Sequence, residues 1–123
     1  MIDHVSIGVR DIAAARRFYD AVLAPLGYRL LQEYPTSLGY GDGHAALWLL
    51  EVERPVPADE KSGLHLCFNA PDRASVDAFH KAALKGGGKD NGKPGLRTDY
   101  GPHYYAAFAL DPDGYRLEAY TGN

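Results

Sequence analysis

Two histidines and one glutamate are the side chains of this sequence best suited to chemistry. His4 and His65 lie 61 positions apart, each near the start of a strand-like segment, and Glu118 lies in the last such segment. Imidazole nitrogens and a carboxylate suit Zn, Fe, Mn, Ni or Co, and three protein ligands leave coordination positions open. A substrate with two adjacent oxygens could chelate such an ion, which would stabilise negative charge developing on one of them. We therefore predict that His4, His65 and Glu118 bind one divalent metal, with Glu118 also available as a base.

A plainer interpretation of the three residues stays open. The histidines can be polar residues on exposed strand faces, and Glu118 can pair with Arg116 or with a lysine. The alternation of side chains favours the metal site, because in each strand-like segment the candidate ligand lies opposite the apolar face. All three ligands then project from equivalent faces.

The spacing of the two histidines belongs to a duplication of the whole chain. At the same offset of 61 residues, matching or similar residues recur in order, as in Val9/Ala70, Asp11/Asp72, Phe18/Phe79, Ala21/Ala82 and Gly27/Gly88. Self-similarity at a fixed offset indicates repeated structural units.

Each copy reads as one strand, one helix and further strands. In the first copy we predict strands at about 2–9, 27–34, 36–41 and 44–53, with a helix capped by Asp11 and ended by Pro25-Leu26-Gly27. In the second copy we predict strands at 63–70, 103–110 and 115–120 and a helix from Asp72 to about Leu84. Residues 86–102 are rich in glycine and read as a loop, with room for a short strand, and as a candidate lid.

These elements predict an α+β fold in a single domain. Two βαβββ modules, at about 1–53 and 63–123 with a linker at about 54–62, would form curved mixed sheets around a cleft, with the helices on the outer face. The predicted metal site lies in that cleft.

Other residues are expected to contact a small-molecule substrate. Trp48 would form an aromatic wall or fill the core, and Cys67 lies on the face of His65, although a lone cysteine in a strand more often packs. Tyr104 and Tyr105 point to opposite faces, so only one lines the cleft. We predict Tyr104 as a catalytic hydroxyl donor and the following as substrate-binding: Trp48, Cys67, His103, Tyr105, Arg116 and Tyr120. Among the remaining polar residues, Lys89, Lys93 and Arg97 could hold an anionic substrate or simply be solvated, and His44 and His80 read as surface residues.

Composition excludes several classes of protein. With 46% hydrophobic residues the chain can bury a core, and its net charge of -3 argues against a nucleic-acid partner. No apolar run approaches the roughly 20 residues that span a bilayer, and the N-terminus enters a strand directly, so we expect a cytoplasmic protein without a membrane partner. Cys67 is the only cysteine, which agrees with a reducing compartment.

The sequence resembles the vicinal oxygen chelate superfamily, which includes glyoxalase I, bleomycin-resistance proteins, fosfomycin thiol transferases and extradiol dioxygenases. The resemblance covers nearly the whole chain and rests on Asp3-His4-Val5, Arg16-Arg17-Phe18-Tyr19, Leu26-Gly27-Tyr28, Gly63-Leu64-His65-Leu66 and Asp111-Pro112-Asp113-Gly114-Tyr115-Arg116-Leu117-Glu118. It implies paired βαβββ modules, metal ligands at His4, His65 and Glu118, and a homodimer whose sites are shared between chains.

One departure from the family pattern refines the expectation. Glyoxalase I has a fourth protein ligand at the position that matches Trp48, and tryptophan cannot supply it. The resemblance therefore favours a three-ligand enzyme acting as a lyase, thiol transferase or dioxygenase. Two alternatives remain: a metal-free binding protein of bleomycin-resistance type, and a small dimeric module used for interaction or regulation.

Overall fold

The chain folds into two successive βαβββ units, described over all 123 residues by a computed structural model. Module 1 contains β1 (Val5–Val9), α1 (Ile12–Leu23), the 3-10 turn η1 (Ala24–Leu26), β2 (Arg29–Tyr34), β3 (Ser37–Asp42) and β4 (His44–Glu51). Module 2 contains β5 (His65–Asn69), α2 (Arg73–Lys85), β6 (Lys89–Leu96), β7 (Tyr105–Leu110) and β8 (Arg116–Thr121). The prediction of an α+β fold with two βαβββ modules is confirmed.

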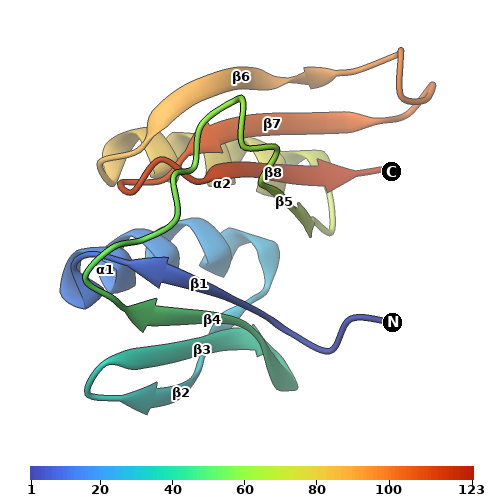
Figure 1. Cartoon of the computed structure of the whole chain (residues 1–123). Helices are drawn as coiled ribbons and strands as arrows, with labels where there is room; N and C mark the ends of the chain where they lie inside the picture. The colour runs from blue at the N-terminus through green and yellow to red at the C-terminus, as the bar shows by residue number, and fades with distance from the viewer.

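Each module is one mixed sheet covered by one helix. The strand orders are β1-β4-β3-β2 and β5-β8-β7-β6, with β1 parallel to β4, β5 parallel to β8 and antiparallel pairing elsewhere. Both helices lie behind the sheets in Figure 1, where the edge strands β1 and β5 are neighbours at the junction of the modules. The opposite sheet faces, which we call the open faces, therefore look to the same side of the molecule.

Local signals in the sequence set the helix boundaries. The Asp11 carboxylate accepts hydrogen bonds from the backbone N–H groups of Ala13 and Ala14 at 3.0 and 3.1 Å, and Asp72 caps α2 through the N–H of Ser75 at 2.8 Å. The helical segment of module 1 ends at Gly27, whose φ of 90° is accessible to glycine at little cost. Neither helix has the length and apolar character needed to cross a membrane.

A continuous core and several hydrogen bonds join the two modules. The core contains 21 buried residues drawn from both sheets and both helices. At the junction, the buried Tyr19 hydroxyl donates to Asp111 at 2.6 Å, and the Tyr115 hydroxyl donates to the Gly8 carbonyl at 2.7 Å. These bonds reach from α1 and β1 to the turn between β7 and β8, and so hold the modules in one relative orientation.

Two predictions from the sequence need correction. The segment 86–102 was predicted as a loop with room for a short strand, and that strand, β6, takes up residues 89–96. Gly92, Pro94 and Gly95 lie in this irregular edge strand, where a missing N–H donor is tolerated. The candidate lid is therefore reduced to residues 97–102. His80, predicted to be a surface residue, is 6% exposed, and its Nε2 lies 2.8 Å from an Asp90 carboxylate oxygen. It lies on the buried stripe of α2 with Val76 and Phe79.

Candidate metal centre

A hydrogen-bonded network occupies the open face of module 2. His65 Nε2 lies 2.8 Å from one oxygen of Glu118, and the Tyr104 hydroxyl donates to the other oxygen at 2.6 Å. Glu118 is 5% exposed, and hydrogen bonds from these two partners compensate for the burial of its carboxyl group. The structure thus brings together two of the three predicted ligands and the predicted hydroxyl donor.

The sheet register explains why these side chains meet. In the parallel pair β5–β8, Arg116 is opposite His65 and Glu118 is opposite Cys67, so all four residues point to the open face. Leu117 and Ala119, which alternate with Arg116 and Glu118, are fully buried on the helix side. The network lines a cavity of about 420 Å³ whose walls are His65, Tyr100, Tyr104, Phe108, Arg116 and Glu118. We call this the module 2 cavity.

The tyrosines of the C-terminal strands divide between the two faces. Tyr104 packs against Tyr120 with ring centroids 4.0 Å apart and planes tilted by 32°, and Tyr100 contacts Tyr104 edge-to-face at 5.3 Å. Tyr105 points to the helix side, where its hydroxyl donates to Asp77 at 2.6 Å. Burial, together with the neighbouring Glu118, raises the pKa of Tyr104, so the phenol stays protonated and able to donate. The prediction of Tyr105 as a substrate-binding residue places it on the wrong face, and His103 lies in the preceding turn, outside the cavity walls.

Cys67 is close to the network but is a poor nucleophile. Burial raises the pKa of its thiol to about 12, and the charge of Glu118 adds to the shift. The thiol therefore stays protonated near neutral pH.

The third predicted ligand lies in the other module. His4 precedes β1 with its side chain 51% exposed, and its Nδ1 lies 2.8 Å from Asp3. No group of three or more His, Cys, Asp or Glu side chains within the single chain is arranged to hold a metal ion. His4 is therefore not brought to His65 and Glu118 within one molecule.

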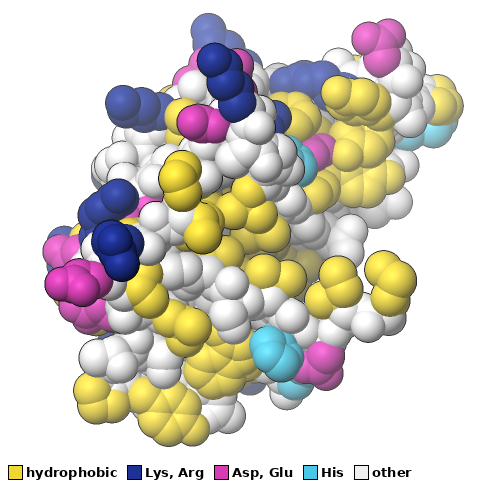
Figure 2. Space-filling model, viewed as in Figure 1, with side chains coloured by type: hydrophobic (Ala, Val, Ile, Leu, Met, Phe, Trp, Pro, Cys, Tyr) yellow, Lys and Arg dark blue, Asp and Glu magenta, His cyan; other side chains and the backbone are white.

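Trp48 lies on the open face of module 1, on the same side as Leu50. Its ring stacks on Tyr34 with centroids 6.3 Å apart, and it packs over Gly39, where a Cβ would approach the indole to 3.0 Å. Tyr34 is 55% exposed and Leu50 37%. Figure 2 shows hydrophobic side chains gathered on this side of both modules, around an adjacent histidine and acidic residue in module 2.

Some lining residues were missed by the sequence analysis. Phe108 faces Glu118 across β7 and β8, and its ring lies 6.0 Å from that of His65. The alternation of β7 could have found it, because Phe108 is the one large residue between the buried Ala107 and Ala109. Tyr100 lies in a turn, where side chains follow no regular alternation, so the sequence pattern could not have predicted its place in the cavity wall.

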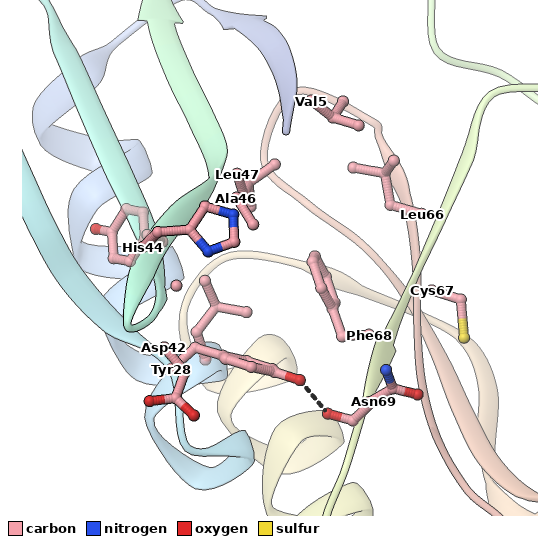
Figure 3. Close-up of a pocket in the computed structure, with 13 residues that line it drawn as sticks. Val5, Tyr28, Asp42, His44, Ala46, Leu47, Leu66, Cys67, Phe68 and Asn69 are labelled. Carbon is pink, nitrogen blue, oxygen red and sulfur yellow. Dashed lines mark hydrogen bonds between the residues drawn. The ribbon is translucent and has the colours of Figure 1, made fainter. Parts of the chain in front are cut away.

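A second cavity, of about 310 Å³, separates the edge strands β1 and β5 at the module junction. Figure 3 shows Phe68 and Tyr28 inside it, with the Tyr28 hydroxyl donating to the Asn69 carbonyl at 2.9 Å. Cys67 lies on its wall, between this junction cavity and the network. Most of its lining is apolar, and the Asp42, His44 and Cys67 side chains on its wall are not arranged to hold a metal ion.

The fold and the paired His and Glu side chains define a class of small α+β proteins built from two βαβββ modules. The model of the Glyoxalase/Bleomycin resistance protein/Dioxygenase superfamily matches residues 1–119, and the chain belongs to this superfamily.

Individual relatives support the assignment. A glyoxalase/bleomycin resistance protein from Albidiferax ferrireducens T118 is similar in structure, with a TM-score of 0.85, 30% identity and 98% of each chain covered. The fosfomycin resistance protein FosX from Mesorhizobium loti shares the fold, with a TM-score of 0.71 and 19% identity over 100% of this chain and 92% of that one. An uncharacterised Bacillus subtilis (strain 168) protein, YqjT, is 27% identical over 120 residues, 94% of each sequence.

Proposed function

We propose that this protein is a divalent-metal-dependent enzyme whose small-molecule substrate chelates the metal through two adjacent oxygens. The observation that carries the proposal is the juxtaposition of His65 and Glu118 in an open cavity, with Tyr104 donating to the same carboxylate. The reaction belongs to the lyase, thiol-transferase or dioxygenase types of the superfamily.

The donor atoms fit a metal such as Zn, Fe, Mn, Ni or Co. Two ligand atoms bound to one such ion lie about 3.0–3.4 Å apart, given metal–ligand bonds near 2.1 Å. His65 Nε2 and the Glu118 oxygen are 2.8 Å apart, so a few tenths of an ångström of side-chain movement would admit an ion between them. His65 Nδ1 is buried without a hydrogen-bond partner, so Nε2 is the ring nitrogen that faces Glu118 and is placed to bind the ion.

We propose that the missing ligand is His4 of the partner subunit in a two-fold dimer. Both open faces look to the same side, so a two-fold axis can place module 1 of one chain over module 2 of the other and generate two equivalent sites. The exposed Tyr34 and Leu50 of module 1 and the exposed Tyr100 of module 2 are apolar surface that such a dimer would cover.

The network and the aromatic rings around it have separate roles in the proposed enzyme. His65 and Glu118 hold the ion, which supplies charge stabilisation for an oxyanion on the substrate. The Tyr104 hydroxyl orients Glu118 and, when the carboxylate moves, can donate to a substrate oxygen. The rings of Tyr100 and Phe108, which line the cavity, exclude water from one side of the site, and Tyr120 packs against Tyr104.

The test is elemental analysis of protein purified without an affinity tag. The expected result is a near-stoichiometric divalent metal in the wild type and its loss in His4→Ala, His65→Ala and Glu118→Gln. His44→Ala is the matched control, because His44 is an exposed histidine that also lies beside Asp3. Equal metal content in His4→Ala and the wild type would remove His4 from the site. Absence of metal from the wild type, even after titration, would refute the enzyme proposal.

The second candidate is a metal-free binding protein of bleomycin-resistance type. The apolar junction cavity and the packed rings of Tyr104 and Tyr120 favour it, because they offer surfaces for a planar or apolar molecule without metal chemistry. Binding of such a molecule with equal affinity in the wild type, His65→Ala and Glu118→Gln would support this candidate over the enzyme.

A further inference from the structure

The module 2 cavity contains one cation without an acidic partner. Arg116 shares the open face with Glu118 and lies opposite His65 in the β5–β8 pair. Glu118 is bonded to His65 and Tyr104, and the Arg116 side chain forms no ion pair or hydrogen bond with any group of the chain. Its Nε is buried without a partner, which costs free energy, and the residue lines the cavity, where another molecule could approach its positive charge.

A second cation lies at the edge of the same cavity. The Arg97 guanidinium lies over the Phe108 ring, 5.3 Å from its centroid, and Phe108 is one of the cavity walls. Arg97 is bonded only to the Lys93 carbonyl, so its charge is also unneutralised. By contrast, Arg10 and Arg16, on other surfaces, both pair with carboxylates.

We infer that the substrate carries a carboxylate, which binds Arg116 and is attracted by Arg97 while its adjacent oxygens bind the metal. A guanidinium forms two parallel hydrogen bonds with a carboxylate, and partial burial strengthens them. The inference rests on the proposed function, which places the chelating oxygens of the substrate at a metal held by His65 and Glu118. Arg116 is beside these two residues, so a carboxylate on the same molecule can reach it. It names the class of substrate: small oxygen-chelating acids, in preference to their neutral analogues.

Two matched probes test this inference. Calorimetry on the Zn²⁺-loaded protein would compare 3,4-dihydroxybenzoate with 3,4-dihydroxybenzamide, which share the chelating oxygens and differ in charge. The wild type is expected to bind the benzoate about ten- to a hundredfold more tightly. Arg116→Gln should abolish this preference and Arg97→Gln should reduce it, with little change in affinity for the benzamide.

Controls separate recognition from folding and from the metal site. Arg73→Gln is the matched control, because Arg73 forms the same kind of guanidinium–aromatic contact with Tyr105 on the helix side. Thermal unfolding and Zn²⁺ content are measured for every variant. If Arg116→Gln does not fold, Arg116→Lys and Arg97→Gln carry the test, with partial loss of the preference expected in both.

The outcomes distinguish the inference from the proposed function. Equal affinity for the two probes, binding of neither, or a preference unchanged in the Arg116 and Arg97 variants would overturn the carboxylate assignment even with zinc bound. If neither zinc nor Fe, Mn, Ni or Co binds on titration, the proposed enzyme fails, and the same probes are compared on the metal-free protein. An Arg116-dependent preference there would still support the anion site, and its absence would overturn it.

Discussion

Mixing two defective variants should restore metal binding if the site is shared between chains. In the proposed site, one chain contributes His65 and Glu118, which are hydrogen-bonded to each other, and His4 would come from module 1 of the partner subunit. In a heterodimer of His4→Ala with Glu118→Gln, one site keeps all three ligands because its His4 comes from the Glu118→Gln chain. The other site lacks both His4 and Glu118.

The amount of recovered metal follows from dimer statistics. Each homodimer of either variant has no complete site, and an equal mixture that exchanges freely contains about half heterodimers. Each heterodimer has one complete site of two, so about one quarter of the wild-type metal content should return. The stoichiometry is set by the division of ligands, two from one chain and one from the other.

The assay is metal content per chain after exchange and gel filtration, with heterodimer formation verified by native mass spectrometry. The matched control mixes His65→Ala with Glu118→Gln. Because these two ligands come from the same chain, no heterodimer site is complete and no metal should return. Recovery in this control, or no recovery in the test mixture despite verified heterodimers, would refute the shared site.

Three further predictions concern single residues. Tyr104→Phe should weaken metal affinity about 10- to 100-fold in a chelator competition, because it removes the hydroxyl that donates to Glu118. Tyr105→Phe, which removes a hydroxyl on the helix side, should leave metal affinity unchanged. Equal effects of the two substitutions would contradict the role of Tyr104 in orienting Glu118. Burial raises the pKa of Asp111 to about 6 from 3.8, so the folded state binds this proton more tightly than the unfolded state, and stability falls as pH rises through this window. Between pH 5 and pH 7 the free energy of unfolding measured in urea should fall by about 1.4 kcal/mol in the wild type, and this fall should be absent in Asp111→Asn. Identical pH profiles of the two proteins would disprove the assignment of the pH dependence to Asp111. Gly88→Ala should lower the free energy of unfolding by about 1–3 kcal/mol, because the added Cβ would lie 2.5 Å from the Leu110 carbonyl oxygen. Gly101→Ala is the control: its Cβ would have only a 3.8 Å contact, so its unfolding midpoint should be near that of the wild type.

Alternation along the strands predicted much of the geometry of the site. Glu118 and Arg116 project to the open face and Leu117 to the core, as the period of two requires. The same rule predicted that Tyr104 and Tyr105 point to opposite faces of the sheet. It did not predict which of them lines the cavity, because that depends on which face of the sheet the helix covers. Phe108 was overlooked although its strand carried the signal.

Other features depended on irregular structure that periodicity does not report. The glycines and proline of β6 hide a strand that pairs with β7 despite shifts in register. His80 was misread because a polar side chain on a helix stripe is normally solvated, and its burial is compensated here by Asp90.

The sequence by itself determined the duplicated βαβββ architecture, the helix caps and the face on which each candidate ligand lies. These follow from spacing and local chemistry, which act over a few residues or over one repeat. Tertiary structure alone decided that His65, Glu118 and Tyr104 form one network, that Arg116 beside them has no acidic partner, and that His4 stays in the other module. Those facts depend on how two sheets are oriented about their junction, and contacts such as Tyr19 with Asp111, 92 residues apart, set that orientation.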